Sequence, residues 1–144
     1  MTRMPAGYST RSLLDKLGIK PGARIAVLGA PEGYDATLGP FPPGTVRVKS
    51  LRGPLDLIQV FVTRRGELAR RFPALKRALA SNGALWVSWP KRASGVASDL
   101  GEDQVREIGL AHGVVDVKVC AVDEVWSGLK FVYRLKDRPK ATRN

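Results

Sequence analysis

The chain is poor in the residues that most often form crosslinks or carry catalysis. It contains one cysteine, Cys120, and one histidine, His112. A single cysteine excludes an internal disulfide, and its position in an apolar run favours a buried, inert thiol over a nucleophile. His112 comes near the end of an expected helix and has no partner serine or cysteine, which indicates a structural role. Neither residue belongs to a set with the spacing of metal ligands.

Long hydrophobic runs and a secretion signal are also missing. The longest apolar stretch, residues 55–62, is interrupted by Asp56 and Gln59, so it is too short and too polar to span a membrane. Residues 1–8 contain no apolar run of the kind found in a signal peptide. These absences predict a cytoplasmic protein of bacterial type without a membrane partner.

Acidic residues are few compared with basic ones. The chain has 24 Lys and Arg against 13 Asp and Glu, which gives a net charge of +11. Such a charge favours nucleic acid or other anionic partners. A solvated basic surface is the alternative, because the charges lie in several separate segments and accompany no nucleic-acid-binding motif.

What is present is the pattern of a small α/β protein. The 144 residues and their 44% hydrophobic content suit one domain, which we place at residues 1–135, followed by a basic tail at 136–144. Apolar runs between turn signals predict strands at residues 25–28, 45–48, 55–62, 84–89, 114–122 and 129–135. Amphipathic runs predict helices near residues 13–17, 32–38 and 102–112. A further helix is expected to start at Thr63, to kink or break at Pro73 and to stop at Asn82-Gly83.

This order of elements predicts a three-layer α/β fold with a mixed, mostly parallel sheet. One connection bears on strand direction. Only a short connection, which includes residues 51–54, lies between the second strand and the third, whereas a parallel crossover usually needs a dozen residues or more. We therefore expect strand 45–48 to run antiparallel, at the edge of the sheet beside strand 25–28.

Polar and aromatic residues follow several strands at the point where each strand ends. In α/β sheets these strand ends share one edge, which is where ligands bind. The residues expected there are Glu32, Tyr34, Thr63, Arg64, Trp89, Lys91, Ser94, Asp123, Glu124 and Trp126. Structural roles are the alternative: Glu32 in the first turn of a helix, Thr63 as a helix cap and Lys91 paired with Asp123.

The second half of the chain carries a recognisable succession of segments. Residues 56–61 and 75–87 read as strand, helix, glycine turn and strand, and residues 105–119 and 128–133 as a helix with a closing hairpin. This succession resembles the end of the class I S-adenosylmethionine-dependent methyltransferases. The resemblance implies a Rossmann-like fold, here truncated, because the strand–helix units between that family's second and fourth strands are missing.

That resemblance also implies two features of a cofactor site. The family has a glycine-rich turn after the first strand, where this chain has Pro31 and Glu32 between Gly29 and Gly33. The family has an acidic residue after the second strand, where this chain has Lys49. These differences lead us to expect no cofactor, with S-adenosylmethionine as the alternative.

A second resemblance covers most of the chain. Its segments are residues 7–9, 16–22, 30–34, 85–91 and 117–130. They resemble a bacterial family of small proteins that form a domain of unknown function, which implies no particular activity.

The sequence therefore predicts a binding module without a catalytic residue or a metal. It would hold a protein partner or a small ligand at the predicted edge. Two alternatives stay open: a reduced S-adenosylmethionine-dependent methyltransferase, and an accessory protein that binds nucleic acid.

Overall fold

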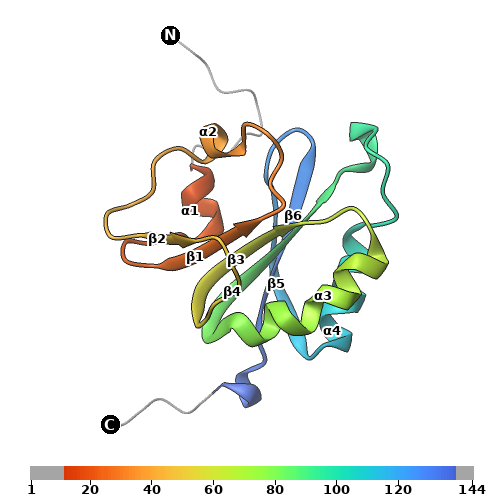
Figure 1. Cartoon of the computed structure of the whole chain (residues 1–144). Coiled ribbons are helices and arrows are strands. Elements are labelled where there is room, and N and C mark those ends of the chain that lie inside the picture. The colour runs from red at the N-terminus through yellow and green to blue at the C-terminus, as the bar shows by residue number, and fades with distance from the viewer. Residues whose placement is uncertain (1–11, 139–144) are drawn as a thin grey trace.

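The computed structural model describes residues 12–138, which form one sheet with helices on both faces (Figure 1). The strands are β1 (Arg24–Leu28), β2 (Val46–Val48), β3 (Leu55–Phe61), β4 (Leu79–Pro90), β5 (Val114–Ala121) and β6 (Trp126–Tyr133). The α-helices are α1 (Leu13–Leu17), α2 (Tyr34–Leu38), α3 (Arg65–Ala78) and α4 (Glu102–Ala111), with short 3₁₀ turns η1 (Arg92–Ser94) and η2 (Leu135–Asp137).

The sheet is mixed and mostly parallel, as predicted. Its strand order is β2-β1-β3-β4-β6-β5. β1 pairs in parallel with β2 and β3, and β3 pairs in parallel with β4. β6 runs antiparallel to both β4 and β5.

Hydrophobic packing on both faces makes the fold three-layered. Alternate residues of a strand point to opposite faces, so Leu57 and Trp86 pack in a cluster with α1 and α2, whereas Ile58 and Leu85 pack in a cluster with α3 and α4. Figure 1 shows α3 and α4 together on one side of the sheet. The continuous apolar runs of β3 and β4 are explained by this burial on both faces.

The predicted direction of the second strand is wrong. β2 lies at the edge beside β1, as expected, but it is parallel to β1. β2 has only three residues, and its last residue, Val48, lies beside Ala26 in the middle of β1. The return to β3 therefore descends only part of the height of the sheet, and residues 49–54 are long enough for it.

The long helix differs from its prediction at two positions. α3 continues through Pro73 as one helix, since Pro73 lies on its exposed face, where water can reach the carbonyl left without a donor. The helix ends at Ala78 rather than at Asn82-Gly83. Those two residues lie inside β4 next to an irregularity in its pairing with β3.

The described residues end within the predicted basic tail, at Arg138, and they include η2. Residues 139–144 lie outside them, and the domain boundary at residue 135 stays a prediction. No helix among residues 12–138 is both long enough and apolar enough to cross a membrane.

Candidate functional site

The edge where the parallel strands β1, β3 and β4 end, called here the upper edge, carries the predicted site residues. The turn between β5 and β6 also lies there, because Trp126 at the start of β6 pairs with Pro90 at the end of β4. The strand ends thus bring together segments that are far apart in the sequence. Their polar groups divide into two halves that differ in hydrogen bonding.

The half above β4 and β6, called here the closed half, is held by Lys91 and Asp123. The ammonium group of Lys91 donates to the carbonyl oxygen of Asp123 at 2.8 Å. The Asp123 carboxylate accepts from the backbone amides of Val125 and Trp126, both at 2.8 Å. These bonds fix the β5–β6 turn, so both side chains have a structural task. Glu124, the residue after Asp123 in the turn, is exposed.

The segment after η1 folds back onto the start of α3 and extends the closed half. The Ser98 hydroxyl donates to the carbonyl oxygen of Thr63 at 2.7 Å. The Asp99 carboxylate accepts from the backbone amide of Arg65 at 2.8 Å, which caps the helix from a distant loop. Thr63 therefore does not cap α3 with its own side chain. Ser94 bonds locally, donating to the carbonyl oxygen of Lys91 at 2.6 Å.

The two tryptophans of the predicted edge lie on opposite faces of the sheet. Trp89 is 5% exposed and packs in the cluster beside α3 and α4. Trp126 packs on the other face, where its ring meets Phe61 edge-on at 5.0 Å between ring centroids. Phe61 in turn meets Tyr34 at 4.8 Å. The two tryptophans therefore cannot line one cleft together.

A buried polar chain lies below this aromatic cluster. The Tyr34 hydroxyl donates to Gln59 Oε1 at 2.7 Å, and Gln59 Nε2 donates to the Ser88 hydroxyl at 3.2 Å. Gln59 and Ser88 are fully buried. Burial, the largest cause, raises the pKa of Tyr34 above its ordinary value, although the bond to Gln59 acts the other way. The sequence analysis did not predict this series of hydrogen bonds between Tyr34, Gln59 and Ser88. Its one signal in the sequence is a glutamine in the middle of a buried strand.

The half above β1 and β2, called here the open half, consists of residues 29–33 and Lys49. Gly29 has φ of 71°, and a Cβ there would lie 3.0 Å from the carbonyl oxygen of Phe61, so the turn leaving β1 requires glycine. Glu32 and Lys49 are exposed. Among residues 12–138, neither side chain forms an ion pair.

Backbone amides are also available in the open half. The amides of Ala30, Glu32 and Gly33 donate to no acceptor within the described part of the chain. The connection that leaves β1 crosses the sheet face covered by α2, whereas the connection that leaves β3 crosses the opposite face, which α3 covers. The open half therefore lies at a topological switch point, where open α/β sheets bind their ligands.

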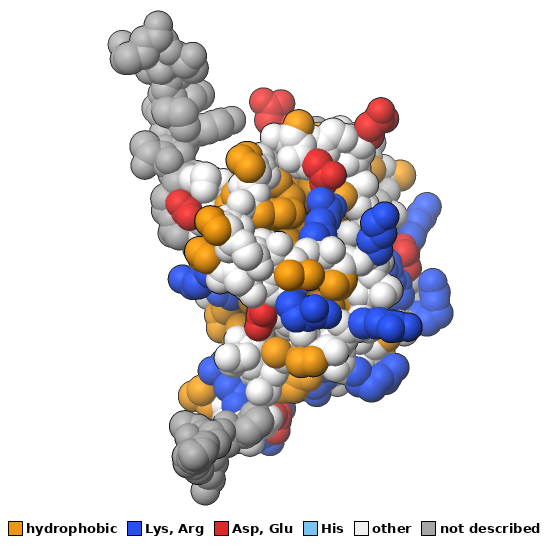
Figure 2. All heavy atoms as spheres, turned by 60° about the vertical axis from the view of Figure 1, so that its left-hand side comes forward, with side chains coloured by type: hydrophobic (Ala, Val, Ile, Leu, Met, Phe, Trp, Pro, Cys, Tyr) orange, Lys and Arg blue, Asp and Glu red, His pale blue; other side chains and the backbone are white. Residues whose placement is uncertain are grey.

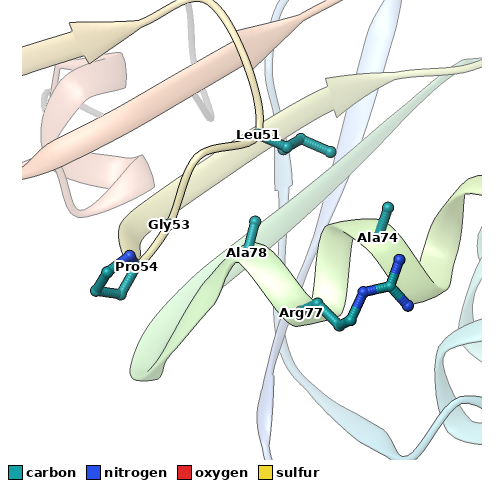
Figure 3. A pocket seen from close by; sticks show the side chains of 6 residues that line it. All are labelled: Leu51, Gly53, Pro54, Ala74, Arg77 and Ala78. Carbon is teal, nitrogen blue, oxygen red and sulfur yellow. The ribbon is translucent and has the colours of Figure 1, made fainter.

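A hollow of about 440 Å³ lies elsewhere, between α3 and the connection from β2 to β3 (Figure 3). Ala74 and Ala78 of α3 face Leu51 across it, and the Arg77 guanidinium is its one charged group. It adjoins Gly53 and Pro54, just before β3 begins, so it is remote from the upper edge. No predicted site residue lines it.

Basic side chains gather on the side of the molecule that carries α3 (Figure 2). This helix has five basic residues and one acidic residue, Glu67, which pairs with Arg71 at 3.2 Å. Arg64, just before the helix, is exposed. The positive charge predicted from the composition is thus concentrated on this side among the described residues in view.

Comparisons with known proteins support the fold. No protein-family model matches the chain, and no curated protein matches it. A solved S-adenosylmethionine-dependent methyltransferase from Aquifex aeolicus is similar at 16% identity and a TM-score of 0.63, over 83% of this chain and 86% of the other. Magnesium protoporphyrin IX methyltransferase from Synechocystis PCC 6803, solved with bound SAM, has 12% identity and a TM-score of 0.58, over 85% and 74%.

A third solved structure, precorrin-6y C5,15-methyltransferase from Geobacter metallireducens, has 12% identity and a TM-score of 0.57, over 85% of this chain and 86% of the other. At such identities the likeness concerns the fold. The chain has the Rossmann-like, three-layer fold of these methyltransferases, and the likeness covers its first half as well as its second.

Proposed function

We propose that the protein binds an S-adenosyl compound at the open half of the upper edge and acts as a reduced methyltransferase. The observation that carries this proposal is the switch point between β1 and β3, in a sheet that matches methyltransferases over most of both chains. An exposed glycine-containing turn leaves β1 at that point. The same fold holds SAM in the Synechocystis enzyme.

The residues of the open half fit such a compound in part. The free amides of Ala30, Glu32 and Gly33 can donate to carboxylate or hydroxyl oxygens. The Glu32 carboxylate attracts a positive sulfonium. When bound, S-adenosylmethionine would supply the methyl group, and the protein would orient it at the edge.

Other residues fit less well and set an expectation for affinity. Pro31 has no amide to donate. The residue after β2 is Lys49, which is a cation. A carboxylate at this position would instead accept hydrogen bonds from ribose hydroxyls. Fewer contacts should hold the adenosyl compound than in an enzyme with both features, so we expect weak binding.

Calorimetric titration with S-adenosylmethionine and S-adenosylhomocysteine tests this proposal. Glu32→Gln should weaken binding of the sulfonium compound about fivefold, which corresponds to roughly 1 kcal/mol for two charges about 4 Å apart in water. It should affect the neutral thioether less. Glu124→Gln is the matched control, since Glu124 is an exposed glutamate of the closed half on the same edge. If titration at millimolar concentration gives no heat of binding, the proposal is excluded.

A binding module without catalysis is the second candidate. The positions of Pro31 and Lys49 favour it, because both depart from what the methyltransferase resemblance implies. The same titration separates the two, since this candidate requires no adenosyl compound. Binding of S-adenosylmethionine without methyl transfer to any offered substrate would favour a module that uses the compound as a ligand.

Nucleic acid as a partner stays a prediction. The basic residues of α3 support this prediction. Lys and Arg side chains neutralise nucleic-acid phosphates, and this contact releases counterions from the nucleic acid. Retention on DNA or RNA at low salt should then fall steeply as salt rises. A protein that is not retained at low salt has no such partner.

A further inference from the structure

A cluster of lysines lies on the face of the sheet that α1 covers. Lys118 of β5 stands directly opposite Lys130 of β6 across their antiparallel pairing. Lys130 is likewise opposite Trp86, which packs in the cluster beside α1. Like charges at directly opposed positions destabilise a sheet. This pair therefore costs stability unless a counter-charge is present.

Lys130 of this pair also lines a hollow, together with a third lysine. Lys20 lies in the turn between α1 and β1, and it lines a hollow of about 410 Å³ together with Lys130. The pKa of Lys130 is lowered below its ordinary value. Burial is the largest cause, and the positive charges of Lys118 and Lys20 add to it. The hollow has the size of a small-molecule site. It adjoins the amino ends of β1 and β3, the edge opposite the open half.

The hollow combines an apolar wall with little negative charge. Pro21, Ala23 and Ala84 contribute apolar surface, and Asn82 contributes an amide. Its one carboxylate, Asp56, already accepts a hydrogen bond from the backbone amide of Arg24 at 2.8 Å.

The three lysines lack acidic partners within residues 12–138, where none of them forms an ion pair. The carboxylate nearest to Lys118 in the sequence, Asp116, binds Arg106 of α4 at 2.9 Å on the other face of the sheet. The protein therefore uses its nearby acidic groups elsewhere.

We propose that this hollow binds the phosphate ester of a small organic molecule. The phosphate would lie beside the ammonium groups of Lys20 and Lys130, and Lys118 would add its charge from the neighbouring strand. The uncharged part of the molecule would contact Pro21 and Ala84. Lysine binds phosphate as a point charge with three donors. A phosphate dianion would remove the repulsion between the opposed lysines, so binding and stability are coupled.

Titration with inorganic phosphate and with phenyl phosphate, at constant ionic strength, tests the site by calorimetry on the full chain. Phenyl phosphate should bind more tightly, because its ring can contact the apolar wall. Lys130→Gln should weaken its binding about tenfold, the effect of one charged hydrogen bond. Lys49→Gln is the matched control, since it removes an exposed lysine at the opposite edge and should change the affinity less than twofold.

Thermal unfolding gives a second, independent readout, in which one substitution should change the melting temperature without ligand and the ligand-induced rise in opposite directions. Lys118→Gln should raise the melting temperature of the ligand-free protein, because it removes a like-charge pair, and it should reduce the further rise that phenyl phosphate causes. Equal losses in Lys130→Gln and Lys49→Gln, or binding of a short oligonucleotide but not of phenyl phosphate, would overturn the proposal. Titration with S-adenosylmethionine concerns the other edge, so the two proposals fail separately.

Discussion

The two halves of the upper edge contain similar residue types but use them differently. In the closed half, Lys91, Asp99 and Asp123 bind the protein's own backbone. In the open half, Glu32 and Lys49 are exposed and form no ion pair among the described residues. A charged residue at a strand end is thus structural in one half and available to a ligand in the other. Hydrogen-bond partners, rather than residue type, separate the two roles.

The largest expected effect concerns Trp89 of the closed half. Trp89→Ala should lower the free energy of unfolding by about 3–5 kcal/mol, because it empties a buried site in the core beside α3. The sequence analysis placed Trp89 among the residues expected at the ligand-binding edge, whereas its side chain is only 5% exposed and packs in the core. Urea unfolding measures the change. A loss below 1 kcal/mol would show that Trp89 is not part of the core.

The buried polar chain gives the next effect. Tyr34→Phe leaves Gln59 Oε1 buried without its donor, so we expect a loss of about 1–3 kcal/mol. The tyrosine keeps its proton to higher pH when folded than when unfolded, where its pKa is 10.0. Its stabilising effect is therefore complete below pH 10 and is lost as the pH rises above it.

Urea unfolding between pH 8 and pH 11 checks this dependence. The stability of the unsubstituted protein should fall more steeply above pH 10 than that of Tyr34→Phe. Parallel curves would mean that the hydroxyl ionises as freely in the folded chain as in the unfolded one.

The neighbouring acidic residues of the β5–β6 turn compare the two roles directly. Asp123→Ala removes the acceptor of two backbone amides and should cost about 1.5 kcal/mol, reduced from a buried case because the turn is partly exposed. Glu124→Ala should change stability by less than about 0.5 kcal/mol. Denaturant midpoints of the two variants test the difference, and equal midpoints would remove the distinction.

The strands could be predicted because their apolar runs are buried on both faces and end in turn signals. The direction of β2 could not, since the rule on crossover length assumes strands of full height and Val48 ends halfway along β1. The start of β4 was missed for a related reason. Asn82-Gly83 is a strong local stop signal, but pairing with β3 holds both residues in the strand.

The upper edge followed from the order of strands, but its division into halves did not. The bond from Asp99 to the amide of Arg65 joins residues 34 apart in the sequence, and the one from Lys91 to Asp123 joins residues 32 apart. No local pattern contains such pairs. The lysines of β5 and β6 were missed in the same way, because only the register of the antiparallel pair brings Lys118 opposite Lys130.

The smallest effect on stability, and the sharpest test of the open half, comes from Lys49→Glu. Lys49 is exposed, so the free energy of unfolding should change by less than about 0.5 kcal/mol. The substitution places a carboxylate after β2, where it can accept hydrogen bonds from ribose hydroxyls.

If the open half holds an adenosyl compound, calorimetry should then show affinity for S-adenosylmethionine at least about tenfold higher, because a hydrogen bond to a charged acceptor contributes about 1.5 kcal/mol or more. Lys91→Glu is an unsuitable control, since it breaks the closed half, whereas Glu124→Lys changes an exposed charge there without doing so. Unchanged affinity in Lys49→Glu, with folding intact, would mean that residues after β2 do not face the ligand, and the comparison between the halves would then rest on structure alone.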